Sequence, residues 1–153
     1  MSLKAIPLLV LSLILYNAIA FFSGGNPNDL FYGTAAIDPA TNAPVITGAE
    51  LFRITMPNGG IWVFSLGDLV LVISLILLAL EVIKATYTRG AGLADQALSM
   101  ILFVIFLVEF LLVDKAATSL FFLLTMMSGV DVVVGSIVGI RTARRDIGFG
   151  GDN

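Results

Sequence analysis

The sequence predicts an all-α membrane protein with four transmembrane helices, both termini cytoplasmic, and a small extracytoplasmic β-hairpin cap between helices one and two. Three observations lead to this prediction. Hydrophobic residues make up 58% of the chain and charged residues only 12%, which is outside the range of soluble domains. Four apolar segments approach the roughly 20 residues that a helix needs to cross a bilayer. The basic residues gather on one side of these segments.

The chain divides at the ends of the apolar segments. Residues 1–22 contain the first predicted helix, Leu3–Phe22, and residues 23–65 form an extracytoplasmic loop. Residues 66–141 hold the other three helices, and residues 142–153 form a cytoplasmic tail. These three helices are predicted at Leu66–Ala85, Ala97–Val113 and Ser119–Ile140. The short connection Asp114–Thr118 is typical of an antiparallel helix pair.

The first segment also has features of a signal peptide. Lys4, a short apolar run and Ala18-Ile19-Ala20 match the pattern of a cleavable leader with a small-residue cleavage site. The apolar run continues through Phe21 and Phe22, past that site. We therefore favour an uncleaved anchor. Cleavage would leave three spans and an N-terminus on the outside.

The distribution of charge sets the predicted orientation, because cytoplasmic loops carry an excess of Lys and Arg. One side collects Lys4, Lys84, Arg89, Arg141, Arg144 and Arg145. The other side holds only Arg53 and Lys115, beside Asp29, Asp38, Glu50, Asp68 and Asp114. Both termini are therefore expected in the cytoplasm.

The extracytoplasmic loop contains two predicted β-hairpins. Leu51–Met56 and Ile61–Ser65 flank the turn Pro57-Asn58-Gly59-Gly60, in which Asn and Gly both tolerate φ > 0. A weaker hairpin turns at 38–44, between 31–37 and 45–47. We favour a cap over the outer helix ends, with Trp62 and Phe64 at the headgroup level. The alternative is a docking surface for another protein.

Polar residues share one face of the fourth helix. Asp131 lies near the middle of this apolar segment, where an acid is costly and is usually retained for function. Residues at spacings of three and four lie on one helix face, and here they are Thr125, Ser128, Asp131, Gly135 and Gly139. The two glycines form a small-xxx-small motif, which permits close helix approach. We predict that this face packs on protein.

The other predicted helices also carry polar residues. In the second helix, Gly67, Ser74 and Glu81 recur every seven residues, the period of a left-handed packing seam. At 1.5 Å per residue, Glu81 lies about 20 Å and Asp131 about 18 Å from the outer end. The two carboxyls can thus share a depth, and Lys84 can pair with either. Glu109 is only about 6 Å from the outer boundary, so we expect a structural role, including a pair with Lys115.

Two interpretations of Asp131 and Glu81 remain open. In one, hydrogen bonds from these acids hold together the bundle or an oligomer. In the other, the acids form the site of a small proton or cation conductor, because like charges in low dielectric raise one pKa. We favour the structural role, because the sequence shows no inverted repeat and no half-helix broken by Gly or Pro at membrane depth.

The composition excludes several function classes. The chain has no Cys and no His, which removes thiolate chemistry, the commonest metal ligand and the commonest general base. A net charge of −3 without a basic tract argues against nucleic acid as a partner. We therefore expect no catalytic residues, metal or cofactor, and no enzymatic activity.

Several runs of residues carry a family resemblance. They are Phe64–Asp68, Glu81–Ala85, Ala97–Met100 and Arg141–Asp146. In these runs the chain resembles a group of small four-helix inner-membrane proteins of unassigned function from alphaproteobacteria. The resemblance implies a multi-pass protein of the bacterial inner membrane and adds no mechanism. We expect an accessory or scaffold protein whose partners are membrane lipid and other membrane subunits or copies of itself.

Overall fold

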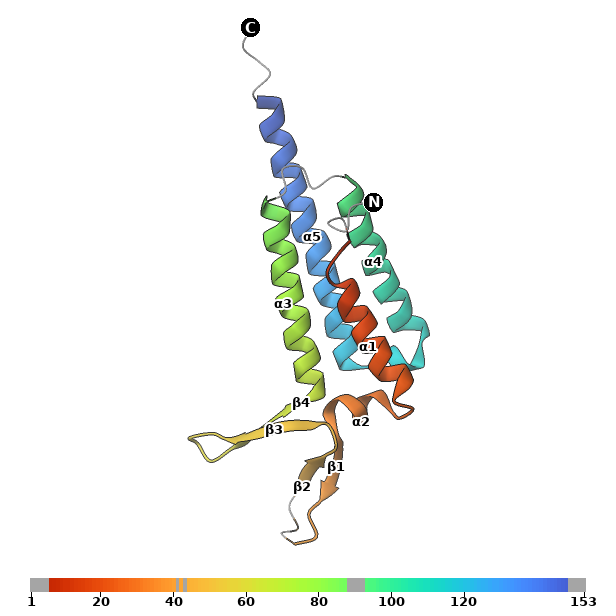
Figure 1. Cartoon of the computed structure of the whole chain (residues 1–153), viewed down its shortest axis with the longest axis vertical. Helices are drawn as coiled ribbons and strands as arrows, with labels where there is room; N and C mark the ends of the chain where they lie inside the picture. Colours follow the sequence, from red (N-terminus) through yellow and green to blue (C-terminus); the bar gives the residue numbers. More distant parts are fainter. Residues whose placement is uncertain (1–5, 41, 43, 88–92, 149–153) are drawn as a thin grey trace.

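The computed structural model describes residues 6–40, 42, 44–87 and 93–148. The fold is mostly helical, with long helices side by side and a β-containing segment at one end of them (Figure 1). The helices are α1 (Val10–Phe22), α2 (Pro27–Tyr32), α3 (Leu66–Tyr87), α4 (Leu93–Leu112), the 3-10 turn η2 (Asp114–Ala116) and α5 (Ser119–Gly148). The strands are β1 (Thr34–Ile37), β2 (Pro44–Thr47), β3 (Glu50–Thr55) and β4 (Ile61–Ser65).

Three of the described helices are long and apolar enough to cross a membrane. Their apolar spans are Leu66–Ala85, Asp95–Leu112 and Ser119–Ile140, close to the second, third and fourth predicted helices. α4 begins at Leu93, four residues before the predicted start at Ala97. α5 continues to Gly148, so residues 142–148 of the predicted tail are helical, while 149–153 lie outside the described residues.

The first predicted helix, Leu3–Phe22, is shorter in the structure. α1 has 13 residues and a length of about 20 Å, less than the roughly 30 Å of a bilayer core. Pro7 accounts for the late start, because proline has no N–H to donate and disfavours helical backbone in the residue before it. Residues 8 and 9 form a turn, and α1 begins at Val10. Four spanning helices are therefore not confirmed, and residues 1–5 lie outside the described part of the chain.

Both predicted hairpins are confirmed, with one change in the turn. β1 pairs with β2 and β3 with β4, each antiparallel. Gly59 has φ +81°, whereas Asn42 is the only non-glycine residue with positive φ in the described chain; Asn58 therefore does not adopt the left-handed conformation. Pro57 explains the difference: it lacks the N–H that would close an Asn-Gly two-residue loop, so the Met56 N–H donates to the Gly60 carbonyl instead, at 2.7 Å.

α2 was not predicted from the sequence, and its last residues, Phe31 and Tyr32, fall in the extended segment predicted at 31–37. The local signals for a helix are present. Asn26 caps the helix by accepting a hydrogen bond from the Asn28 N–H at 3.0 Å, and Pro27 stands in the first turn, both of which favour a helix start. Gly33, at φ +77°, follows the last turn. Phe31, which lies on this helix, is fully buried.

The predicted cap is wrong in its geometry. Both hairpins extend away from the helices rather than over their ends, and α2 lies under α1 at that end instead (Figure 1). β4 runs directly into α3 through a capping box. In this box the Asp68 carboxylate accepts from the Ser65 N–H at 2.9 Å and the Ser65 hydroxyl at 2.7 Å, while the Asp68 N–H donates to Ser65 Oγ at 3.2 Å.

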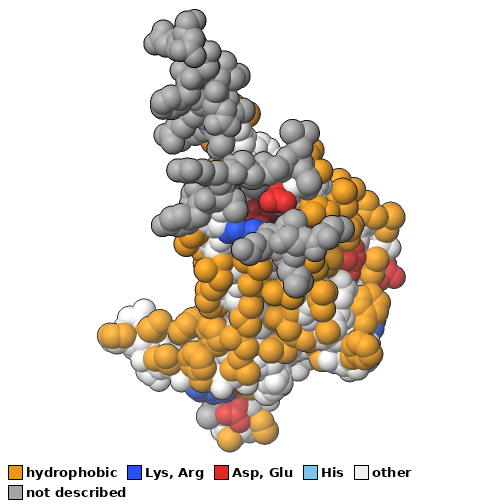
Figure 2. Space-filling model, turned by 45° about the horizontal axis from the view of Figure 1, so that its top comes forward, with side chains coloured by type: hydrophobic (Ala, Val, Ile, Leu, Met, Phe, Trp, Pro, Cys, Tyr) orange, Lys and Arg blue, Asp and Glu red, His pale blue; other side chains and the backbone are white. Residues whose placement is uncertain are grey.

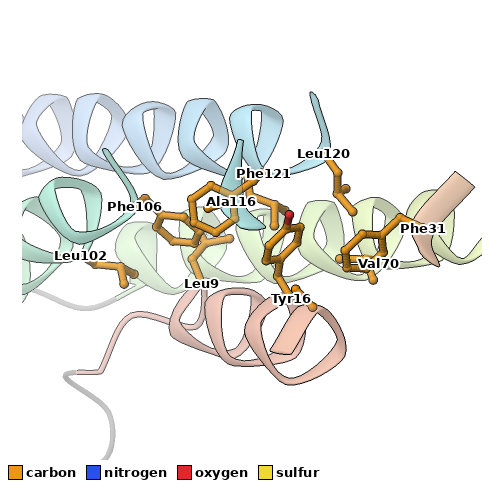
Figure 3. Packing of buried hydrophobic residues seen from close by; sticks show 11 residues of the cluster. Leu9, Tyr16, Phe31, Val70, Leu102, Phe106, Ala116, Leu120 and Phe121 are labelled. Carbon is orange, nitrogen blue, oxygen red and sulfur yellow. The ribbon is translucent and has the colours of Figure 1, made fainter. Parts of the chain in front are cut away.

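The buried hydrophobic core joins α1, α2, α3, α4 and α5 (Figure 3). Tyr16 stacks on Phe31 with ring centroids 4.8 Å apart and meets Phe121 edge-on at 4.7 Å. Its hydroxyl donates to the Lys115 carbonyl at 2.7 Å and lies 2.8 Å from Thr118 Oγ1. Tyr16 thereby ties α1 to the α4–α5 connection. Large hydrophobic side chains also cover the outside of the helices (Figure 2).

Candidate functional site

The candidate site is a cluster of buried polar residues around the beginning of α1. Glu81 of α3 and Asp131 of α5 are 8% and 6% exposed. Glu81 and Lys84 both lie close enough to Asp131 to interact with its carboxyl electrostatically. The two acids that the sequence placed at one depth are therefore brought together by the packing of α3 on α5.

Glu81 has partners on its own helix and on the chain before α1. Lys84 Nζ donates to Glu81 Oε1 at 2.9 Å, and the Leu8 N–H donates to Glu81 Oε2. Lys84 also donates to the Ile6 carbonyl at 3.4 Å. Because the N–H groups before and within the first turn of a helix lack intrahelical acceptors, the Glu81 carboxylate satisfies a donor that would otherwise be buried without one.

This contact corrects one expectation from the sequence. The start of α1 lies beside Glu81, about 20 Å along α3 from its outer end, and this helix begins only after Pro7, at Val10. The helix of the first apolar segment therefore starts within the length of the long helices. The conductor interpretation gains a helix start beside Glu81, and the absence of an inverted repeat in the sequence still counts against it.

Asp131 is less completely bonded than Glu81. The hydroxyl of Ser99 on α4 approaches the Asp131 carboxyl. Its second oxygen, Oδ2, is buried and has no hydrogen-bond partner among the described residues. An unpaired buried carboxylate oxygen is costly, so a proton, a cation or another donor at this atom would relieve a deficit.

The predicted face of α5 lies inside the chain. Thr125, Ser128 and Asp131 are all buried, and Thr125 Oγ1 donates to the Phe121 carbonyl at 2.9 Å. A Cβ on Gly135 would lie 2.5 Å from the side-chain oxygen of Gln96, whereas one on Gly139 would meet nothing described within 4 Å. Gly135 therefore faces α4, and the two glycines of the motif have different surroundings.

Gln96 was missed by the sequence analysis. Its Nε2 donates to the Val132 carbonyl at 3.0 Å and to Ser136 Oγ at 2.8 Å. This side chain therefore bridges α4 and α5 one turn from Asp131. The residue stands one position before the predicted helix start, and the acid in the first turn, Asp95, was the signal for an earlier start.

The predicted seam of α3 is buried along its length. Ser74 is fully buried and donates to the Val70 carbonyl at 2.7 Å. A Cβ on Gly67 would lie 2.8 Å from the ring of Tyr32, so this glycine allows α2 to pack on α3. Burial raises the pKa of Tyr32, and the nearby Asp68 carboxylate adds to the effect.

A second polar group lies at the outer end of the helices. The amide of Asn17 approaches the Glu109 carboxyl. Lys115 is engaged elsewhere: its ammonium donates to the Ala20 carbonyl at 3.2 Å and lies 5.1 Å from the centre of the Phe21 ring. These contacts fasten the end of α1 to α4 and to the α4–α5 connection.

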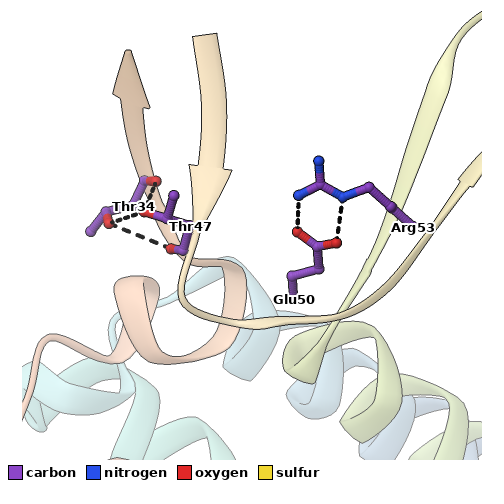
Figure 4. Close-up of polar contacts among 4 residues, drawn as sticks. All are labelled: Thr34, Thr47, Glu50 and Arg53. Atoms are coloured by element: carbon purple, nitrogen blue, oxygen red, sulfur yellow. Dashed lines mark hydrogen bonds and ion pairs between the residues drawn. The ribbon is translucent and has the colours of Figure 1, made fainter. Parts of the chain in front are cut away.

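The outer loop carries the remaining predicted residues. The turn Pro57–Gly60 lies at the tip of the β3–β4 hairpin, and Trp62 lies on β4 beside Phe52 and Phe64. Hydrogen bonds between Thr34 and Thr47 link β1 and β2, and Glu50 pairs with Arg53 (Figure 4). Hydrogen bonding from the Arg53 guanidinium lowers the pKa of Glu50.

The chemistry of the cluster is limited by its donors. Within the described ranges, no group of three acids is placed to hold a metal ion. The cluster can hold charge and protons, and the Ser99 hydroxyl lies against the Asp131 carboxyl. Comparisons with protein families, with curated proteins and with solved structures found no match for this chain.

Proposed function

We propose that this protein is an integral accessory or scaffold subunit of the bacterial inner membrane, assembled with other subunits through its transmembrane helices. In this proposal α3, α4 and α5 cross the bilayer and both termini are cytoplasmic. α1 lies in the outer part of the bilayer and extends from the outer end of the bundle to about the level of Glu81. Its partners are membrane lipid and another membrane protein, or a second copy of the chain. It has no enzymatic role.

One observation carries the proposal: an apolar groove on the exposed surface of α4 and α5. The groove has a volume of about 440 Å³ and is lined by Phe103, Met126, Gly129, Val130, Val132, Val133 and Val134. Gly129 is ten residues into α5, about 15 Å from its outer end and therefore near mid-bilayer in this placement. Small residues in such a surface let another helix approach closely.

The interior of the bundle supports the same conclusion. The polar groups of Thr125, Ser74 and Gln96 are bonded within the chain, and Glu81 is paired with Lys84. A helix face whose side chains are packed and hydrogen-bonded within the chain is not available for assembly. Gly135 is used in this way, because it faces Gln96. We therefore propose the groove around Gly129 as the contact surface, in place of the Gly135–Gly139 motif, with a transmembrane helix of another subunit as its occupant.

The experiment measures the mass of the full chain extracted from native membranes in mild detergent. We expect a defined complex larger than one chain. Val133→Trp fills the groove from a position that is 58% exposed, so it should dissociate the complex without disturbing the fold. Gly139→Leu, on the same helix at a position where a Cβ would meet no described atom within 4 Å, is the matched control and should leave the complex intact.

Two results would contradict this proposal. A wild-type chain that is monomeric in mild detergent and in nanodiscs has no partner to lose. A complex that survives Val133→Trp does not form through the groove. Mass spectrometry of the wild-type complex distinguishes a second copy from a different subunit, because the former yields a multiple of 16.2 kDa.

A second candidate, a small proton or cation conductor using Asp131 and Glu81, is favoured by the unpaired oxygen of Asp131. The start of α1 just after Pro7, beside Glu81, adds to this support, because transporters place helix ends at their binding sites. Under this candidate, Asp131→Asn abolishes flux into proteoliposomes while the complex mass is unchanged. Equal flux in wild type and variant would eliminate it.

A further inference from the structure

The two faces of the β3–β4 hairpin differ in chemistry. Phe52 lies opposite Phe64 and Ile54 opposite Trp62, whereas Arg53 lies opposite Val63 and Thr55 opposite Ile61. Residues that pair across strands share a face, and successive residues along a strand lie on opposite faces. One face is therefore entirely apolar, and we call it the aromatic face: Phe52, Ile54, Trp62 and Phe64. The other face carries the charge.

The aromatic face is ordered but uncovered. Phe52 and Phe64 stack with centroids 4.7 Å apart, and Trp62 meets their edges at 6.2 and 5.7 Å. Phe52 and Ile54 are each 46% exposed and Trp62 is 43% exposed. A two-stranded hairpin is marginally stable alone in water. This surface therefore requires an apolar or amphipathic surrounding outside the chain.

The base of the hairpin lies at the expected bilayer boundary. β4 ends at Ser65 and α3 begins at Leu66, which is also the first residue of its apolar span. The hairpin extends sideways, across the direction of the helices (Figure 1). Six residues at about 3.3 Å each give a reach of about 20 Å. The hairpin thus runs along the boundary and does not leave it.

The charged groups lie on the other side of the strands. Arg53 projects from the opposite face and pairs with Glu50, and half of its side chain is exposed. Hydrophobic side chains line the hairpin when the molecule is seen obliquely from the end where α5 terminates (Figure 2). In the proposed placement that end is cytoplasmic, so the hairpin presents hydrophobic side chains on the side that faces the bilayer.

We infer that the β3–β4 hairpin is an interfacial anchor, which lays its aromatic face into the headgroup layer of the outer leaflet. Tryptophan and other amphipathic rings are favoured at this depth, and the ion pair on the opposite face stays in water. Lipid is the occupant because β4 runs directly into α3, whose first residue, Leu66, is also the first residue of its apolar span. The inference rests on α3 crossing the membrane, as in the proposed function.

Trp62 provides a direct test, because it is the only tryptophan of the chain. The full-length protein is reconstituted in phosphatidylcholine vesicles that contain lipids brominated near the headgroup or deep in the acyl chain. We expect shallow bromines to quench the fluorescence more than deep ones, and aqueous acrylamide to quench it weakly. Emission should lie at shorter wavelength than that of a hydrated indole.

Matched variants separate the two faces and the two hairpins. Ile54→Glu places a charge on the aromatic face and should increase acrylamide quenching and shift the emission to longer wavelength. Thr55→Glu, on the neighbouring strand position and the opposite face, should leave both unchanged. The double variant Trp62→Phe/Ile46→Trp moves the reporter to the β1–β2 hairpin, where acrylamide should quench it strongly.

Three outcomes would overturn the inference. Strong acrylamide quenching of Trp62 with no lipid quenching puts the aromatic face in water. Protection from both quenchers puts it against protein. Equal effects of Ile54→Glu and Thr55→Glu remove the distinction between faces. None of these changes the mass of the extracted complex, so the anchor can fail while the groove proposal stands. Failure of the chain to float with vesicles would contradict both.

Discussion

The helical bundle and the outer hairpins both expose apolar side chains, but they do so in different ways. The long helices are apolar around their outer surfaces and keep their polar groups inside, as Glu81, Thr125 and Ser128 illustrate. The β3–β4 hairpin has no interior, so its aromatic side chains gather on one face, and the charged Arg53 shares the other face with Thr55, Ile61 and Val63. In the proposed placement the bundle lies within lipid and buries its polar groups, whereas the hairpin lies along the boundary and carries its aromatic side chains and its charge on opposite faces.

The strongest test of this comparison removes the best-bonded polar group in the bundle. Glu81→Ala leaves the Lys84 ammonium and the Leu8 N–H without their shared acceptor. Both partners of the pair are less than a third exposed, so we expect a loss of about 3 kcal/mol of unfolding free energy. Titration with sodium dodecyl sulfate in mixed micelles measures it.

The control for this variant removes both charges. Glu81→Gln/Lys84→Met retains an acceptor for the Leu8 N–H and takes away the half-buried ammonium, so it should recover most of the lost stability. If Glu81→Ala costs no more than a surface substitution, the polar interior does not stabilise the bundle, and the comparison between the two regions fails.

The next prediction concerns the two glycines of α5. Gly135→Leu would push Gln96 away from Val132 and Ser136, with an expected cost of about 2 kcal/mol from overpacking. Gly139→Leu enters space where nothing described lies within 4 Å, so its effect should stay within about 0.5 kcal/mol. Thermal unfolding in detergent compares them. Equal costs would mean that the face is not internal.

A smaller effect is expected in the core, where α1 meets α2 and the α4–α5 connection. Tyr16→Phe keeps the stacking on Phe31 and removes the hydroxyl that bonds the Lys115 carbonyl and Thr118. The loss of a buried hydrogen bond predicts a cost of about 1 kcal/mol. Thr118→Val is the complementary variant, and the double variant should be less than additive because both remove one contact.

The sequence predicted those features that follow from local periodicity. Hydropathy located the three long helices, and alternation with turn residues located both hairpins. The seven-residue spacing placed Gly67, Ser74 and Glu81 on one face, and all three are buried. Such patterns are properties of a single element and need no knowledge of its neighbours.

Features that depend on tertiary packing were not predictable in the same way. Hydropathy averages over a window, so the first segment was predicted as one long helix, whereas α1 begins only after Pro7, at Val10. Gly135 and Gly139 look alike in sequence, but only the first meets Gln96. The direction of the hairpins depends on how β4 enters α3, which no residue pattern specifies.

The smallest predicted effect lies on the charged face of the β3–β4 hairpin and concerns pH. Hydrogen bonding from Arg53 lowers the pKa of Glu50 below its ordinary value of 4.5. A carboxyl with a lowered pKa contributes stability above its unfolded value and loses it as the pH falls through the folded value. The pair should therefore persist from neutral pH to below 4.5 and break only at lower pH.

Carbon-13 NMR of the Glu50 carboxyl in the full chain measures the titration. Arg53→Gln should return the midpoint toward the ordinary value, and the exposed position of the pair means that global stability should scarcely change. A midpoint that does not respond to Arg53→Gln would show that the pair does not form, and the charged face would then lose the feature that distinguishes it from the aromatic one.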